Sequence, residues 1–112
     1  MARTREPLET LSTPRAVSSA QRVLSVVDGI PRGKVMAYGD IAKLLGLGHR
    51  EVARVLAHEG SEVSWWRVLR SNGTCAPHLE QTQLKLLRSE GVPMRGPDRV
   101  DMAAARLTEF GE

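Results

Sequence analysis

Cysteine is almost absent from the sequence, which contains Cys75 alone among its 112 residues. A single thiol excludes an internal disulfide framework and fits a reducing, intracellular compartment such as the cytoplasm. Long apolar runs are also missing, because no stretch approaches the roughly 20 consecutive apolar residues that a membrane-spanning helix needs. Residues 1–15 lack the apolar segment of a secretory signal. We therefore expect a cytoplasmic protein with no membrane partner.

Metal ligands and phosphate-binding glycine motifs are equally sparse. The three histidines lie far apart in the sequence, and the single cysteine has no second cysteine at metal-ligand spacing. The segment Gly46-Leu47-Gly48 lacks the lysine and the preceding strand of a phosphate-binding loop. We therefore expect neither a metal site nor a bound cofactor.

The size and the charge of the chain set wider limits. With 112 residues, 41% of them hydrophobic, the chain suits one domain with a modest core and is too apolar to be disordered throughout. Sixteen basic residues against 13 acidic ones give a formal net charge of +3 and a sequence pI of about 9.6. This mild excess permits a polyanionic partner but does not require one.

The pattern of apolar residues divides the chain into a flexible N-terminal arm over residues 1–13 and a single domain over residues 14–112. Thr13 and Pro14 are typical of a helix start, with a hydroxyl at the N-cap and proline at the first helical position. Apolar residues then recur at three- and four-residue steps as far as Gly29, which predicts an amphipathic helix.

The centre of the chain predicts a helix-turn-helix. Residues 40–45 and 49–58 each favour a helix, and the glycine-containing residues 46–48 connect them. Residues 64–69 and 74–76 favour two strands joined by a tight turn, which would form a hairpin, or wing. The remaining predicted helices span residues 79–90 and 100–107. The expected fold is therefore mainly α, a winged-helix-like helix-turn-helix domain with a small β-hairpin.

The second helix of this pair carries positive charge and small side chains on one face. With a rotation of about 100° per residue around a helix axis, Arg50, Arg54 and His58 lie within about 80° of one another. Ala53 and Ala57 border them, and small residues let a helix approach a groove closely while arginines pair with phosphates. The same pattern is typical of the solvated face of an ordinary amphipathic helix, so spacing alone leaves both interpretations open.

The adjacent tryptophans Trp65 and Trp66 are the most unusual feature of a chain with only one tyrosine and one phenylalanine. In the expected strand, neighbouring side chains point to opposite faces. One indole would then join the core while the other lines a pocket, where it can stack on an extruded base or contact an alkyl group. Burial of each ring in the core is the alternative interpretation.

Four segments together resemble the DNA-binding domain of the O6-alkylguanine-DNA alkyltransferases, the methylated-DNA–protein-cysteine methyltransferases. The resemblance covers roughly residues 20–92, and the segments agree with the family motifs in order and spacing. It implies a fold that docks its helix-turn-helix in the minor groove. The segments are Ile30-Pro31-Arg32-Gly33-Lys34-Val35, Tyr38-Gly39-Asp40-Ile41-Ala42, Ala53-Arg54-Val55 and Ser64-Trp65-Trp66-Arg67-Val68.

The chain departs from the repair enzymes at the position of their catalytic cysteine, where it has Trp65. In those enzymes a thiolate, activated through a neighbouring histidine and a glutamate, accepts the alkyl group. Trp66 stands in place of that histidine, so both the nucleophile and the proton relay are lost. The chain therefore resembles the alkyltransferase-like proteins, non-catalytic relatives that bind the lesion, flip the nucleotide and signal damage to nucleotide excision repair. Ser64 and Trp66 also depart from the usual proline and histidine of those relatives.

The resemblance implies roles for individual residues. Tyr38 would press on the phosphate 3′ to the lesion, and Arg54 would fill the vacated space and pair with the orphaned cytosine. Trp65 would line the lesion pocket and Arg67 would brace it. His78 would donate a hydrogen bond to the damaged base, unless it is a surface residue at a helix start. The implied DNA-binding residues are Tyr38, Arg50, Ala53, Arg54 and Ala57. The implied lesion pocket comprises Tyr38, Trp65, Trp66, Arg67 and His78.

The expected partner is double-stranded DNA containing O6-alkylguanine, bound by a monomer, with nucleotide excision repair proteins as further partners and a nucleoid location in a bacterium. Two other functions stay open at this stage. An active alkyltransferase would have to use Cys75, which lies outside any histidine-arginine motif. A winged-helix transcriptional regulator would read the major groove with polar side chains, which the small residues of the second helix do not favour.

Overall fold

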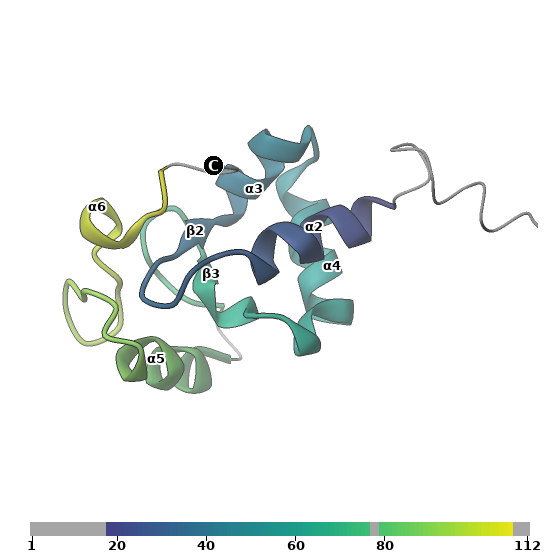
Figure 1. Cartoon of the computed structure of the whole chain (residues 1–112). Helices are drawn as coiled ribbons and strands as arrows, with labels where there is room; N and C mark the ends of the chain where they lie inside the picture. Colours follow the sequence, from purple (N-terminus) through teal and green to yellow (C-terminus); the bar gives the residue numbers. More distant parts are fainter. Residues whose placement is uncertain (1–17, 77–78, 109–112) are drawn as a thin grey trace, which may run out of the picture.

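The computed structural model describes residues 18–76 and 79–108 and confirms a mainly helical fold (Figure 1). Within these residues there are five α-helices, two short 3₁₀ helices and one two-stranded sheet. None of the helices described is both long and apolar enough to cross a membrane. The elements are α2 (Ser19–Asp28), β2 (Met36–Ala37), α3 (Tyr38–Leu45), α4 (His49–Glu59), η2 (Gly60–Glu62), η3 (Trp65–Arg67), β3 (Val68–Leu69), α5 (Glu80–Ser89) and α6 (Met102–Ala105).

Helix α2 begins later than the sequence pattern predicts. Its N-cap is Ser18, whose hydroxyl accepts a hydrogen bond from the Gln21 N–H at 3.1 Å. The predicted start at residues 13–14 is therefore wrong for this helix; those two residues, like the predicted arm over residues 1–13, lie outside the described residues. Val23 and Val27, one helical turn apart, are fully buried and fix the inner face.

Helices α3 and α4 form the predicted helix-turn-helix. The Asp40 carboxylate accepts a hydrogen bond from the Ala37 N–H at 2.9 Å and so caps the start of α3. Gly46 ends α3 in the left-handed region at φ 73°, a conformation that favours glycine. Helix α4 then turns Val52 and Val55 inward, where they pack against α2 and α3.

The predicted β-hairpin is wrong, because the two strands of the sheet are parallel and far apart in the sequence. Met36 pairs with Val68, and Ala37 pairs with Leu69. The predicted turn after β3 is present, since the Gly73 N–H donates to the Arg70 carbonyl at 2.8 Å. Residues 74–76, however, form no strand. The local turn signal is therefore correct, whereas the strand partner is set by long-range packing.

The sheet lies between two apolar clusters. Figure 1 shows the sheet with α2, α3 and α4 on one side and α5 and α6 on the other. Met36 and Val68 face the cluster formed with α2, α3 and α4. Leu69 and Val35, which directly precedes β2, face the cluster formed with α5 and the C-terminal residues. Val35 and Met36, and likewise Val68 and Leu69, thus enter different clusters, as the two-residue period of an extended chain dictates.

The segment after α5 packs against the loop that follows β3. The Val100 N–H donates to the Gly73 carbonyl at 2.9 Å. Gly73 has φ 89°, and a Cβ atom there would lie 2.3 Å from the Val100 carbonyl oxygen, so only glycine fits. The Leu107 N–H donates to the Val35 carbonyl at 2.8 Å and ties the end of this segment to the sheet. The predicted helix over residues 100–107 is shortened to α6.

Candidate nucleic-acid interface

The outer face of α4 combines exposed arginines with exposed alanines. Arg50 and Arg54 lie one turn apart on this face, and Ala53 and Ala57 lie beside them. His58, in the last turn, places its Nδ1 atom 2.9 Å from the Arg54 carbonyl oxygen. The structure therefore brings the predicted DNA-contacting residues of α4 onto one solvent-facing surface.

This face borders a positively charged depression of about 450 Å³, here called the outer cavity. Arg50 contributes from α4, and Arg70 contributes from the loop after β3. Arg70 carries no sequence signal, because nothing in the pattern indicates that this loop reaches α4. Its charge makes the rim suitable for phosphate oxygens. The lining residues are Tyr38, Gly39, His49, Arg50, Ala53, Arg70, Ser71 and Ala76.

A second depression of about 350 Å³, here called the inner cavity, adjoins the outer one. The two share Tyr38, Ala53 and Ala76 as lining residues. No charged side chain is among the described residues that line the inner cavity, so it suits a neutral ligand with an apolar substituent. Its lining consists of Tyr38, Ala53, Leu56, Ala57, Gly60, Ser61, Trp65, Ala76, Leu79 and Gln83.

Tyr38 stands at the junction of the two cavities, at the first position of α3 directly after β2. Burial raises the pKa of its phenol above the ordinary value, and the Arg70 guanidinium offsets only part of that effect. The phenol therefore stays protonated at neutral pH and can donate a hydrogen bond to a phosphate or a base.

The two tryptophans occupy different environments, but not for the reason predicted. They lie in the 3₁₀ helix η3 rather than in a strand, and their rings meet edge to face with centroids 6.0 Å apart. Trp65 lines the inner cavity. Trp66 is not among the described residues of that lining; it packs instead against the apolar cluster of α5.

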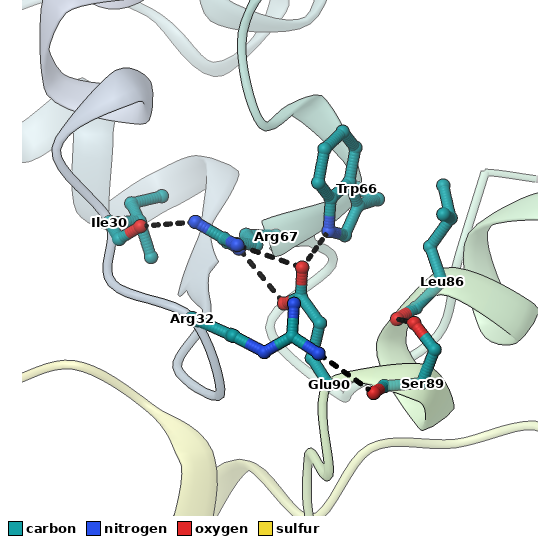
Figure 2. A network of polar contacts seen from close by, with 7 residues as sticks. All are labelled: Ile30, Arg32, Trp66, Arg67, Leu86, Ser89 and Glu90. Atoms are coloured by element: carbon teal, nitrogen blue, oxygen red, sulfur yellow. Dashed lines mark hydrogen bonds and ion pairs between the residues drawn. The ribbon is translucent and has the colours of Figure 1, made fainter.

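The Trp66 and Arg67 side chains converge on Glu90, directly after α5 (Figure 2). The Trp66 Nε1–H donates to Glu90 Oε2 at 2.8 Å, and the Arg67 Nε–H and Nη2–H donate to the two carboxylate oxygens at 2.9 and 2.8 Å. Arg67 Nη1 also donates to the Ile30 carbonyl at 2.7 Å. Arg67 therefore braces η3 against two other segments, and its guanidinium lies outside the described lining of the inner cavity.

The electrostatics of this network keep Glu90 ionised. Burial of the carboxyl would raise its pKa, but the hydrogen bonds from Arg67 and Trp66 outweigh burial and hold the pKa below its usual value. The Glu90 side chain is 4% exposed, so the ion pair is largely withdrawn from water. Glu90 was not predicted from the sequence. The alkyltransferases that the chain resembles use a glutamate in their proton relay, and this likeness could have pointed to it.

Cys75 does not have the environment of a nucleophile. Its side chain is buried in the cluster of α5, and it is not among the described residues that line the inner cavity. Burial, aided by the nearby Glu80 carboxylate, raises the pKa of the thiol to about 11. The reactive thiolate is therefore scarce at neutral pH. His78, the other predicted residue of this loop, lies outside the described residues.

The helix-turn-helix, the arginine-bearing α4 and the adjoining cavities define a DNA-binding domain of one known family. The family model described as "6-O-methylguanine DNA methyltransferase, DNA binding domain" matches residues 18–92, more than half of the chain, and the chain belongs to this family.

Three similar proteins carry three different names. The chain is 41% identical over 96 residues to the "DNA base-flipping protein" of Escherichia coli K12, which covers 80% of this chain and 74% of the relative. It is 38% identical over 79 residues to "Alkyltransferase-like protein 1" of Schizosaccharomyces pombe, and this match covers 63% of this chain and 73% of the relative. It is also 35% identical over 80 residues to a "Methylated-DNA--protein-cysteine methyltransferase" of Methanothermobacter thermautotrophicus, and this match covers 68% of this chain and 46% of the relative.

A solved structure matches the fold closely. The crystal structure of S. pombe Atl1 in complex with damaged DNA containing O6-carboxymethylguanine superposes with a TM-score of 0.72 at 28% identity. The match covers 80% of this chain and 94% of that protein. A second crystal structure of the same S. pombe protein with DNA gives a TM-score of 0.71 at 29% identity.

Proposed function

We propose that this protein binds double-stranded DNA containing O6-alkylguanine and flips the damaged nucleotide into the inner cavity without transferring the alkyl group. The single observation that carries this proposal is the position of Trp65. It lines the inner cavity beside the arginine-bearing helix, at the place that the sequence motif gives to an acceptor cysteine in the repair enzymes.

The arrangement of Tyr38 and α4 supports the proposal of nucleotide flipping. Extrusion of a base costs roughly a few kcal/mol, and less where alkylation has already weakened the pair. Arg54 would offset part of this free energy by filling the vacated stack, because its side chain is exposed between small alanines. Tyr38, at the junction of the cavities, would hold the rotated phosphate, and Arg50 and Arg70 would bind neighbouring phosphates.

The uncharged lining of the inner cavity suits the alkyl group itself. Each Å² of apolar surface removed from water contributes about 25 cal/mol. The Trp65 ring and Leu56 supply such surface, so larger alkyl groups that fit should bind more tightly than methyl.

Neither tryptophan supports alkyl transfer. The Trp65 indole has no thiolate-like nucleophile. The Trp66 indole N–H donates to Glu90 but cannot accept a proton, so this pair holds geometry without relaying charge. Binding is therefore reversible, and the bound lesion stays in the DNA for another system to remove. We propose that nucleotide excision repair proteins are that system, that the protein acts as a monomer, and that it works where chromosomal DNA lies.

Alkyl transfer can be tested directly with duplex DNA that carries a radiolabelled methyl group on O6 of guanine. We expect the label to stay on the DNA after incubation, whereas a relative with an acceptor cysteine removes it. Label on this protein would overturn the non-enzymatic proposal, and its loss in Cys75→Ser would identify Cys75 as the acceptor.

Lesion recognition is tested by comparing duplexes that differ only by one O6-methylguanine. The wild-type protein should bind the damaged duplex at least about tenfold more tightly, and Arg54→Ala should lose most of that preference. Arg95→Ala removes a matched exposed arginine from the C-terminal segment and should change little. Equal affinity for both duplexes, with a preference for one undamaged sequence, would instead favour a transcriptional regulator.

A further inference from the structure

The position of Tyr38 depends on the backbone that leads into α3. Ala37, at the N-cap of this helix, has no side-chain atom that can accept a hydrogen bond, so another residue must fix the start of α3. Asp40 does so, because its Oδ2 atom accepts from the Ala37 N–H at 2.9 Å. The orientation of the Asp40 carboxylate therefore affects the point at which the chain turns from β2 into Tyr38.

Arg106, in the C-terminal segment, holds that carboxylate in place. Its Nε–H donates to Asp40 Oδ2 at 2.9 Å, and its Nη2–H donates to Asp40 Oδ1. This two-point contact restricts rotation of the Asp40 side chain. Burial would raise the pKa of Asp40, but the hydrogen bonds from Arg106 and Ala37 outweigh burial and hold the pKa below its ordinary value. Asp40 is therefore ionised at neutral pH and binds Ala37 and Arg106 together.

The backbone around Arg106 also holds the strand that leads into Tyr38. The Val35 N–H donates to the Ala105 carbonyl at 3.0 Å, and the Leu107 N–H donates to the Val35 carbonyl at 2.8 Å. Val35 and Arg106 thus pair as residues of parallel strands do. Two backbone hydrogen bonds and one ion pair, all between residues 35 and 40, therefore join the C-terminal segment to the start of α3.

Arg106 lies outside both cavities of the candidate interface. Neither Asp40 nor Arg106 is among the described residues that line the outer or the inner cavity. Both border a separate depression between α3 and the C-terminal segment. Tyr38, in contrast, lines both cavities and packs against the apolar cluster of α2, α3 and α4. A change in the direction of the chain at Ala37 would therefore move the phenol relative to α4.

We propose that Arg106 is a positioning residue for nucleotide flipping, which through Asp40 holds Tyr38 where its phenol meets the rotated phosphate. This inference rests on the proposed function. A binding side chain must be held within about 0.5 Å of its productive place, and supporting hydrogen bonds provide this precision. The C-terminal segment is then part of the flipping machinery, although Arg106 lines neither cavity.

The test measures the lesion preference, which is the ratio of the affinities for two duplexes that differ only by O6-methylguanine in place of one guanine. Arg106→Gln should lower this ratio about threefold, because Tyr38 is no longer held in place. The affinity for the undamaged duplex should not change, since the arginines of α4 are untouched. The matched control is Arg95→Gln, the same substitution at an exposed position of the C-terminal segment, which should keep both values.

A double-mutant cycle separates positioning from a general loosening of the fold. Tyr38→Phe removes only the phenol hydroxyl and should lower the lesion preference by a similar factor, while Arg54 and the inner cavity still contribute to what remains. If Arg106 acts through this hydroxyl, adding Arg106→Gln to Tyr38→Phe should have no further effect. A general loosening of the fold would instead lower the ratio by the same factor in both backgrounds.

Three results would overturn the role of Arg106. These are an unchanged lesion preference in folded Arg106→Gln, equal losses in the two backgrounds, and a full lesion preference in Tyr38→Phe. Equal weakening of both duplexes by Arg106→Gln would indicate a direct phosphate contact and would contradict the proposal as well.

A second variant covers the case in which circular dichroism shows that Arg106→Gln does not fold. Arg106→Lys then takes its place in the cycle, because lysine keeps the charge but not the two-point contact. Failure of the proposed function looks different, because the wild-type protein would then show no lesion preference.

Discussion

Glu90 joins the end of α5 to η3 through three hydrogen bonds from Trp66 and Arg67. Arg67 and Trp66 approach it from the segment before β3, whereas Glu90 itself follows α5. A buried ion pair of this kind adds little net stability compared with an apolar pair of similar shape, but removal of one partner leaves the other charge stranded. The network therefore fixes the geometry of η3, and through it the position of Trp65.

Replacing Glu90 with glutamine should lower the free energy of unfolding at neutral pH by about 3 kcal/mol, because Arg67 loses its counter-charge in a buried site. The pKa of Glu90 is depressed in the folded state. Its stabilisation is therefore present above the unfolded pKa of about 4.3 and is lost as the pH falls through the lower folded value. Urea denaturation at several pH values should show the difference between wild type and Glu90→Gln shrinking below about pH 4.

The matched control is Glu62→Gln, which neutralises an exposed carboxylate and should leave the stability of the protein nearly unchanged. A Glu90→Gln variant as stable as wild type at pH 7 would contradict the importance of the ion pair. A stability difference that persisted unchanged at low pH would contradict the depressed pKa.

Among the elements, the loop after β3 depends on a single glycine. Gly73 makes the turn at positive φ and also lets the C-terminal segment approach. Gly91 has φ 75°, but a Cβ atom added there would meet no atom of the described residues within 4 Å. The two glycines thus share the same backbone requirement and differ only in the space around them.

Alanine at Gly73 should destabilise the protein clearly more than alanine at Gly91. Backbone strain at positive φ costs about 1–3 kcal/mol at either site. Only the Gly73→Ala variant must also displace Val100, whose carbonyl oxygen would lie 2.3 Å from the new Cβ atom. Thermal unfolding of both variants measures the difference. Equal losses of Tm would mean that the C-terminal segment moves away freely.

Local sequence patterns predict the helices better than the sheet. The second helix of the pair is expected over residues 49–58 and ends at Glu59, because its apolar spacing and flanking glycines are both local signals. The partner of β3 is β2, more than thirty positions earlier, and no local pattern identifies such a pairing. The strand expected around Trp65 is wrong for the same reason, since that segment is a 3₁₀ helix whose Trp66 and Arg67 side chains bind the distant Glu90.

On the scale of the whole molecule, the modest net charge of +3 is less informative than its distribution. Arg50 and Arg70 come from different segments but meet at the outer cavity, while Arg67 is used internally. Sequence reasoning finds Arg50 and Arg54 because they share one helix face. It could not find Arg70, which reaches the outer cavity only when the loop after β3 is folded against α4.

Binding to DNA should weaken as the salt concentration rises, because phosphate contacts release counterions. Arg50→Ala should reduce the slope of log Kobs against log salt concentration by about 1. It should also weaken binding to damaged and undamaged duplexes equally. Fluorescence anisotropy over a salt series measures both effects. An unchanged slope in Arg50→Ala would show that this arginine makes no phosphate contact.

The burial of Cys75 has a practical consequence for experiments in solution. The chain's single thiol is shielded and protonated at neutral pH, so alkylating reagents and maleimide dyes should leave the native protein unmodified. A cysteine introduced at exposed Ser25 would then be labelled selectively without first mutating the native one. A dye at that position on α2 would report docking on damaged duplexes in an otherwise unaltered protein.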